Sequence, residues 1–234
     1  MLGSGLRQAV ELILSLDAEL LHIILLSLRV SATALVFSTL LGVPLGAWLG
    51  LRRFFARRLV IAAVYTGMGF PPVVVGLFVY MLLSRSGPLG SLGSPLVPQL
   101  FTPGAMVIAQ IIIATPLVAG FTMAAVMGVD PNLRQQLISL GATPWQATRA
   151  VLREARQGVV VAVVAGFGSV ISEVGAVMLV GGNIEGSTRV LTTAIVLETH
   201  KGNFSLALAM GIVLLTIAFA INSVVLRLQG KAFG

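Results

Sequence analysis

Cysteine is absent from this 234-residue sequence, and only two histidines, His22 and His200, are present. Without cysteine the chain forms no disulfide, offers no thiolate to a metal and has no cysteine nucleophile, and two histidines are too few for a histidine-rich metal site. Charged residues are also scarce, at 10% of the chain against about 25% in soluble domains. The composition therefore predicts no bound metal or other cofactor.

Apolar residues make up 57% of the sequence, and the mean hydropathy is +1.02. Five apolar segments are long enough to cross a hydrocarbon core of about 30 Å at about 1.5 Å per residue, and no two-residue alternation of the β-barrel kind accompanies them. These segments are residues 26–51, 59–83, 104–128, 159–180 and 204–226. We expect a single all-α transmembrane domain, residues 1–234, that crosses the cell membrane about five times.

The first 19 residues are less apolar than the segments that follow. Glu11, Asp17 and Glu19 interrupt this stretch, which favours an interfacial helix over a sixth span. A cleaved signal peptide is disfavoured, because it needs a basic start directly before its apolar stretch. Here acidic residues come before that stretch and Arg29 comes after it.

Arginine and lysine are concentrated in two loops. Of 15 basic residues, four lie in residues 52–58, four in residues 129–158 and two in the C-terminal tail. The positive-inside rule places these regions in the cytoplasm, with the N-terminus outside and the C-terminus inside. The net charge of +7 thus reflects membrane orientation, and we do not expect binding to nucleic acid.

Glycines recur at four-residue spacing in the first segment, at Gly42, Gly46 and Gly50. Such spacing lets helices approach closely, within a bundle or between two copies of a chain. An ordinary membrane-helix composition explains it equally well.

Pro71 and Pro72 lie inside the second segment and must break its hydrogen-bond ladder, because neither has an N–H to donate. A broken helix at membrane depth needs protein or a water-filled cavity beside it, so the pair predicts either a lining of the translocation path or a plain kink. Glu173 is the one acidic residue well inside a segment, and we interpret it as a gating or interhelical hydrogen-bonding group. Ser169 and Ser172 either line the path with hydroxyls or bond to their own backbone.

Residues 129–158 form a loop longer than a turn requires. Asp130 is a predicted N-cap followed by proline at the first helical position, and Gly141 ends the helix that follows. Thr143 and Pro144 start a second helix towards Glu154.

This helix, glycine, helix arrangement resembles the Glu-Ala-Ala loop of ABC importer permeases. That pattern places Glu-Ala-Ala six to four residues before a glycine and an apolar residue ten after it. Gly141 and Val151 occupy the last two positions here, while Gln135-Gln136-Leu137 replaces Glu-Ala-Ala. Arg-Glu-Ala-Arg at 153–156 stands where most members have Leu-Pro.

A second stretch strengthens the resemblance. Residues 172–184 read Ser-Glu-Val-Gly-Ala-Val-Met-Leu-Val-Gly-Gly-Asn-Ile, and together with residues 186–195 they are similar to the fourth span and outer loop of molybdate and tungstate permeases. Residues 153–156 and 196–199 are closest to the tungstate branch. The resemblance covers nearly the whole chain from about residue 20.

The resemblance implies a type I ABC importer permease fold, a homodimer, two cytoplasmic ATPase subunits and an external binding protein that delivers the oxyanion. It implies that the ATPase docks on the 129–158 loop, where Trp145 is alternatively an aromatic anchor at the membrane interface. The docking residues it implies are Gln135, Leu140, Gly141, Ala142, Pro144, Trp145 and Val151. Because the chain lacks Gly-x-x-x-x-Gly-Lys-Ser/Thr, we expect no ATP hydrolysis by this subunit.

Other possibilities are weaker. The resemblance implies tungstate as the cargo, with molybdate, sulfate or another anion as the alternative, because in such systems we expect specificity to lie mainly in the external binding protein. The charged side chains of residues 183–203 form either a surface for that protein or a solvated loop.

Two other classes of protein fit the sequence less well. A secondary transporter would show internal repeats and more intramembrane carboxylates. A membrane enzyme would show a nucleophile with a base, or a set of metal ligands.

Overall fold

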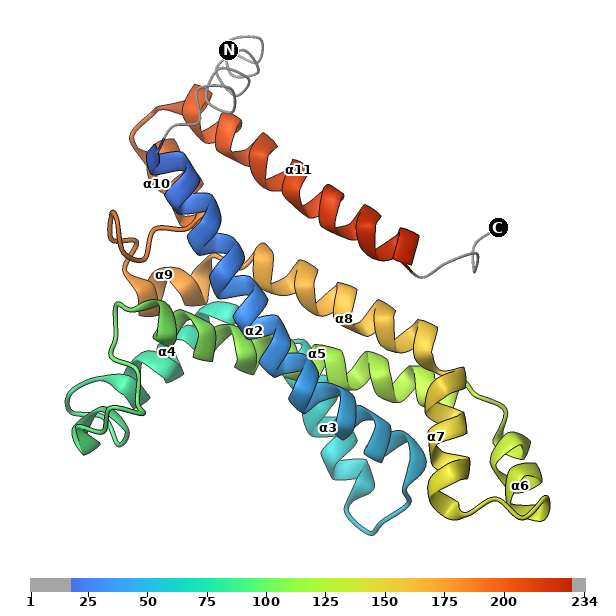
Figure 1. Cartoon of the computed structure of the whole chain (residues 1–234). Helices are drawn as coiled ribbons and strands as arrows, with labels where there is room; N and C mark the ends of the chain where they lie inside the picture. The colour runs from blue at the N-terminus through green and yellow to red at the C-terminus, as the bar shows by residue number, and fades with distance from the viewer. Residues whose placement is uncertain (1–17, 229–234) are drawn as a thin grey trace.

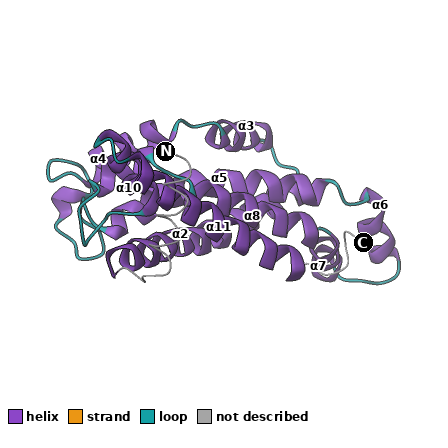
Figure 2. Ribbon diagram, turned by 90° about the horizontal axis from the view of Figure 1, so that it is seen from above, coloured by secondary structure: helices purple, strands orange, loops and turns teal. Residues whose placement is uncertain are grey.

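The computed structural model describes residues 18–228, and every regular element in that range is a helix (Figure 1). Figure 2 shows α6 and α7 at one end of the bundle and α4 and α10 at the other. The elements are α2 (Ala18–Leu51), α3 (Arg57–Met68), α4 (Pro72–Leu83), the 3₁₀-helix η1 (Gly90–Leu92), α5 (Pro103–Met127), α6 (Pro131–Ser139), α7 (Pro144–Glu154), α8 (Arg156–Ile171), α9 (Gly175–Gly181), α10 (Leu191–His200) and α11 (Phe204–Leu228).

Three single helices, α2, α5 and α11, are long and apolar enough to cross a membrane. Two bent pairs bring the number to five if each pair is one span: α3 with α4, bent by 101°, and α7 with α8, bent by 60°. The prediction of about five spans therefore agrees with the structure. The predicted interfacial segment, residues 1–19, lies outside the described residues except for its last two, which begin α2.

The fourth predicted segment, 159–180, is wrong as a continuous helix. α8 ends at Ile171, and the short α9 starts only at Gly175. The break is stabilised locally: the Ser172 hydroxyl donates to the Gly168 carbonyl at 2.7 Å, and the Glu173 carboxylate accepts from the backbone N–H of Ala176 at 2.9 Å. The Glu173 carboxylate thus satisfies a backbone N–H in the first turn of α9, while the Gly168 carbonyl accepts the Ser172 hydroxyl in addition to the Ser172 N–H.

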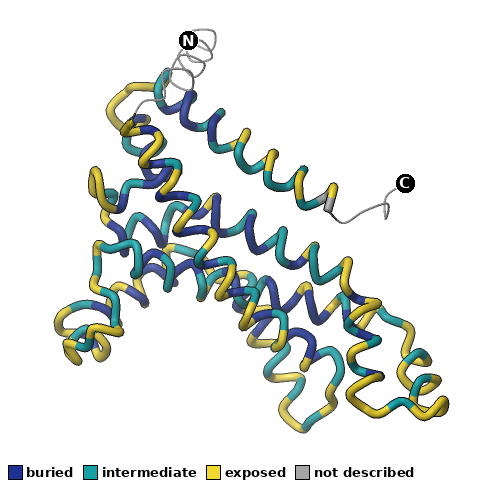
Figure 3. Tube along the Cα trace, in the orientation of Figure 1, coloured by how far each residue is buried: buried dark blue, intermediate teal, exposed yellow. Residues whose placement is uncertain are grey.

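α5 lies at the centre and contacts α2, α3, α4, α8 and α9. The three spaced glycines of α2 all face it. A Cβ at Gly42 would lie 2.9 Å from the Val118 Cβ, and one at Gly50 would lie 2.8 Å from a Val126 methyl. Close helix approach is therefore the correct interpretation of this spacing. Figure 3 shows the buried residues gathered along this central contact.

α11 is set apart from the central helices. It packs mainly on α10 and touches α8 only weakly. Leu215 and Phe219 are 70% and 75% exposed. In a membrane protein such a face is covered by lipid or by another chain.

Candidate functional site: the 129–158 loop and two helix breaks

The turn between α6 and α7 is closed by backbone hydrogen bonds. Gly141 has a φ of +90°, which L side chains rarely adopt. Its N–H donates to the Ile138 carbonyl at 3.0 Å, and the Ala142 N–H donates to the Leu137 carbonyl at 3.0 Å. This pair of bonds is a Schellman motif, which satisfies the last carbonyls of α6. The predicted end of the helix at Gly141 is thus confirmed.

Both loop helices also begin as predicted. The Asp130 carboxylate accepts from the Asn132 N–H at 2.9 Å at the start of α6. At the start of α7, the Gln146 N–H donates to the Thr143 hydroxyl at 3.3 Å, while the Gln146 side chain accepts from the Thr143 N–H at 2.8 Å. This capping box and the Schellman motif fix the backbone on either side of residues 141–142.

One face of α7 attaches the loop to the membrane helices. Ala147 and Val151 are buried at 0% and 4% exposure. Val151 joins a cluster with Ala47 of α2 and Val126 of α5. Of the predicted docking residues, Val151 is therefore the one that the structure places inside, where it anchors the loop.

The remaining predicted residues lie towards the solvent. Leu140 is 84% exposed and Trp145 is 72% exposed, on either side of the Gly141 turn. Gln135 and Pro144 are also exposed, and Ala142 is half-buried. Two large apolar side chains thus lie exposed on a turn whose backbone is fixed by hydrogen bonds.

The two helix breaks lie next to each other. As the two prolines predict, α3 ends at Met68 and α4 starts at Pro72, with Pro71 exposed and Pro72 half-buried. The first turn of α4 lies against the first turn of α9: a Cβ at Gly175 would overlap a Val73 methyl at 2.6 Å, and one at Gly76 would overlap the Ala176 Cα at 2.6 Å. The structure therefore brings the Pro71–Pro72 break and the Glu173 break together.

Hydrogen bonds from other helices hold the second break in place. Thr192 of α10 donates to the Glu173 carbonyl at 2.9 Å. Gln110 of α5 donates to the Val170 carbonyl at 2.9 Å. Ser27 of α2 accepts from the Leu191 N–H at 2.8 Å, which fixes the start of α10. Glu173 itself is 7% exposed.

Sequence reasoning missed Gln110, Thr192 and Ser27. A signal existed for Gln110, because it is the only amide side chain in the 104–128 segment. Beside these groups lies a cavity of about 10 Å³, a volume at the lower limit for a single water molecule and too small for an oxyanion. Ser169 is half-buried, and the bond from Ser172 to its own helix confirms the backbone-bonding alternative for that residue.

The segment 183–203 is not a solvated loop throughout, because Leu191 and Thr193 of α10 are at most 1% exposed. Arg189 pairs with Glu19 and Glu185, each at 3.3 Å. Lys201 pairs with Glu198 at 2.7 Å. The hydrogen bonds from Lys201 and from the Asn203 side chain hold the pKa of the Glu198 carboxyl below its usual value.

No metal site emerges among residues 18–228, where no three His, Cys, Asp or Glu side chains are grouped to hold an ion.

Comparison with known proteins identifies the family. Residues 42–232 match the family described as binding-protein-dependent transport system inner membrane component. The chain belongs to this family. It is a multi-pass membrane permease, and the expectation of a transport subunit rather than a catalytic one agrees with the family.

Relatives cover nearly the full length. The chain is 42% identical over 92% of its length to a probable anion ABC transporter permease of Haloferax volcanii, covering 93% of that protein. It is 41% identical over 97% of its length to a tungstate uptake system permease of Peptoclostridium acidaminophilum, covering 98% of that protein. A molybdenum transport permease of Escherichia coli K12 is 32% identical, over 80% of this chain and 87% of that protein.

Solved structures show the same fold. A bacterial alginate ABC transporter, crystallised with an alginate pentasaccharide-bound periplasmic protein, superposes with a TM-score of 0.74 at 22% identity. The match covers 92% of this chain and 80% of that one. The predicted permease fold is therefore confirmed.

Proposed function

We propose that this permease carries an oxyanion, tungstate or a close relative such as molybdate, and that the 129–158 loop is the docking site for a partner ATPase. Two chains form the path, two ATPases bind on the cytoplasmic side, and an external binding protein supplies the anion. In this arrangement the N-terminus is outside and the C-terminus inside, in agreement with the basic loops.

The observation that carries the docking proposal is the Gly141 turn with exposed Leu140 and Trp145 beside it. Two large apolar side chains that are exposed to water on the same turn are unfavourable unless a partner protein covers them. The turn is rigid because the Schellman motif and the capping box fix it from both sides. A rigid turn that fits a cleft of the ATPase passes movement of the ATPase on to the attached helices, whereas a flexible loop would not.

Helices α7 and α8 connect the Gly141 turn to the membrane-spanning helices. α7 is attached to α2 and α5 through Val151, and Ala155 is all that separates it from α8. α8 in turn ends at the Glu173 break, beside the Pro71–Pro72 break. Closure of two ATPases would thus move the segment we assign to the gate.

The oxyanion assignment is supported by the relatives and by chemistry. Permeases named for tungstate and molybdenum transport align over most of the chain. The 20–129 region contains no Asp or Glu at all, so most of the membrane domain offers no fixed negative charge to repel an anion.

Substituting Gly141 with valine tests the docking site. A β-branched residue at a φ of +90° strains the turn by about 1–3 kcal/mol and so disturbs the backbone that positions Leu140 and Trp145. We expect loss of ATPase copurification and of oxyanion uptake. Gly202→Val is the matched control: its φ is +79°, its Cβ would also point into open space, and it lies in the turn between α10 and α11.

Normal ATPase binding by Gly141→Val, or equal loss in Gly202→Val, would contradict the docking assignment. Uptake that continues with an inactive ATPase would instead identify a secondary transporter.

A further inference from the structure

The short loop between α2 and α3, together with the first two residues of α3, reads Arg-Arg-Phe-Phe-Ala-Arg-Arg over residues 52–58. We call these residues the aromatic-basic loop. Because α2 crosses the bilayer and α3 begins the next broken span, the loop lies at the membrane boundary. We propose that it binds the phosphate groups of anionic phospholipids, with Phe55 inserted among the acyl chains.

The loop is held in a fixed shape by its inward-facing residues. The Arg57 Nε donates to the Leu49 carbonyl at 2.9 Å, and its guanidinium also contacts the Met127 sulfur at 3.6 Å. Phe54 packs on a core cluster and stacks on Trp48, with ring centroids 4.4 Å apart. These contacts use Arg57 and Phe54 for structure and leave the other side chains for a ligand.

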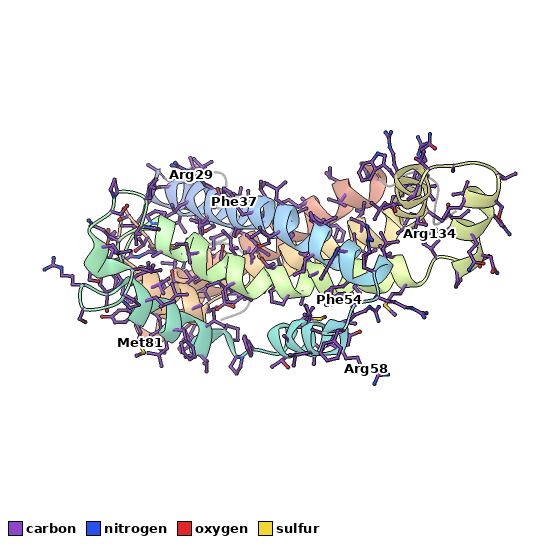
Figure 4. The ribbon with its side chains drawn as sticks, turned by 90° about the horizontal axis from the view of Figure 1, so that it is seen from below. Arg29, Phe37, Phe54, Arg58, Met81 and Arg134 are labelled. Atoms are coloured by element: carbon purple, nitrogen blue, oxygen red, sulfur yellow. The ribbon has the colours of Figure 1, made fainter. Side chains whose placement is uncertain are left out.

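The outward-facing residues combine charge with apolar surface. Phe55 is fully exposed, at 108%, and Leu59 is 73% exposed. Arg52, Arg53 and Arg58 are exposed as well. Figure 4 shows Arg58 on the flank of the molecule, apart from Arg134 on α6. An aromatic ring between guanidinium groups matches the boundary between acyl chains and phosphates.

Within residues 18–228 these arginines have no acidic partner. Between Glu19 and Asp130 the sequence contains no Asp or Glu. Among the described residues, the ion pairs involve only Arg189 and Lys201 as cations. Guanidinium groups bind phosphate through two parallel hydrogen bonds. Membrane orientation alone requires positive charge here, but it does not require an exposed phenylalanine within it.

The fluorescence of Trp48 reports on lipid bound at the loop, because this side chain packs on Phe54 of the loop and is 46% exposed. The chain has two tryptophans, so Trp145→Phe leaves Trp48 as the only one. The full chain with this change is placed in phosphatidylcholine vesicles, and brominated phosphatidylglycerol or brominated phosphatidylcholine is titrated in as a quencher. We expect phosphatidylglycerol to be preferred by at least about fivefold, the ratio that one arginine near an anionic surface supplies. Equal quenching by the two lipids overturns the proposal.

Replacing Arg52, Arg53 and Arg58 together with glutamine should reduce the preference to about onefold. The matched control replaces Arg134, Arg149 and Arg153, three exposed arginines of the 129–158 loop, and should leave the preference unchanged. A preference that survives the first triple change, or falls equally in the second, contradicts lipid binding at this loop.

The alternative to lipid is that a second copy of the chain covers Phe55. Because the sequence lacks cysteine, Phe55→Cys introduces a single thiol. Under oxidising conditions in vesicles we expect this variant to remain monomeric on a non-reducing gel. A disulfide-linked dimer would show that another copy covers Phe55, and would overturn the proposal.

Discussion

Adding one methyl group at Gly46 tests how closely α2 and α5 pack. A Cβ at this position would overlap the Ala119 carbonyl oxygen and lie 2.8 Å from the Thr122 Cβ, where 3.4–4 Å is an ordinary contact. The helices would have to separate by about 0.6 Å or more, and a gap of 0.5–1 Å forfeits about a quarter to a half of each dispersion contact. Overpacking costs about 1–3 kcal/mol, and alanine returns about 0.5–1 kcal/mol through helix propensity.

The difference between the midpoints of these two ranges is a net loss of about 1.25 kcal/mol, which corresponds to a decrease in Tm of about 2.5–5 °C for a chain of this length. Thermal unfolding of the purified protein in detergent measures it. Gly168→Ala in α8 is the matched control, because its Cβ would meet nothing within 4 Å, and it should raise Tm slightly. If Gly46→Ala is as stable as Gly168→Ala, the close packing of α2 on α5 is refuted.

Three further predictions concern single side chains. Thr143→Val removes the capping box of α7 at a cost of about 1 kcal/mol; amide hydrogen exchange in the first turn of α7 should become faster, and unchanged exchange would count against the cap. Gln110→Leu removes the side-chain donor to the buried Val170 carbonyl and leaves it only the longer bond from the Glu173 N–H, at 3.4 Å, so unfolding in detergent should show a loss of about 0.5–1.5 kcal/mol, and no loss would argue against that bond. Because the pKa of Glu198 is lowered in the folded protein, its ion pair stabilises the fold above the usual carboxyl pKa and ceases to do so as pH falls through the lowered value. Across that acidic range the unmodified protein should therefore lose more Tm than Glu198→Gln, and parallel pH profiles would disprove the effect.

The 129–158 loop could be predicted closely because its structure is local. Asp130, Gly141 and Thr143 each act through atoms at most five residues away. Cap and turn preferences are visible in a short stretch of sequence, so the helix limits followed from the residue types alone.

The break at Glu173 could not be predicted in the same way. Residues 159–180 are almost uninterrupted in hydrophobicity and contain no proline, so a continuous helix was the natural expectation. Besides the local bonds of Ser172 and Glu173, bonds from distant helices hold the break, such as the one from Gln110, which is 60 residues from Val170 in sequence. Ser27 and Leu191, which fix α10, are 164 residues apart. Periodicity and local propensity do not report such pairings.

The length of α8 determines how far a small tilt of this helix moves the Glu173 break. Its 16 residues make a rod about 24 Å long, attached to the 129–158 loop at one end and to the Glu173 break at the other. If such a rod tilts by about 10° around one end, the other end moves by about 4 Å. That displacement exceeds the length of any hydrogen bond holding the break. A rotation of this size at the α7 end of α8 would therefore be enough to break the hydrogen bonds that Gln110 and Thr192 make at the Glu173 break.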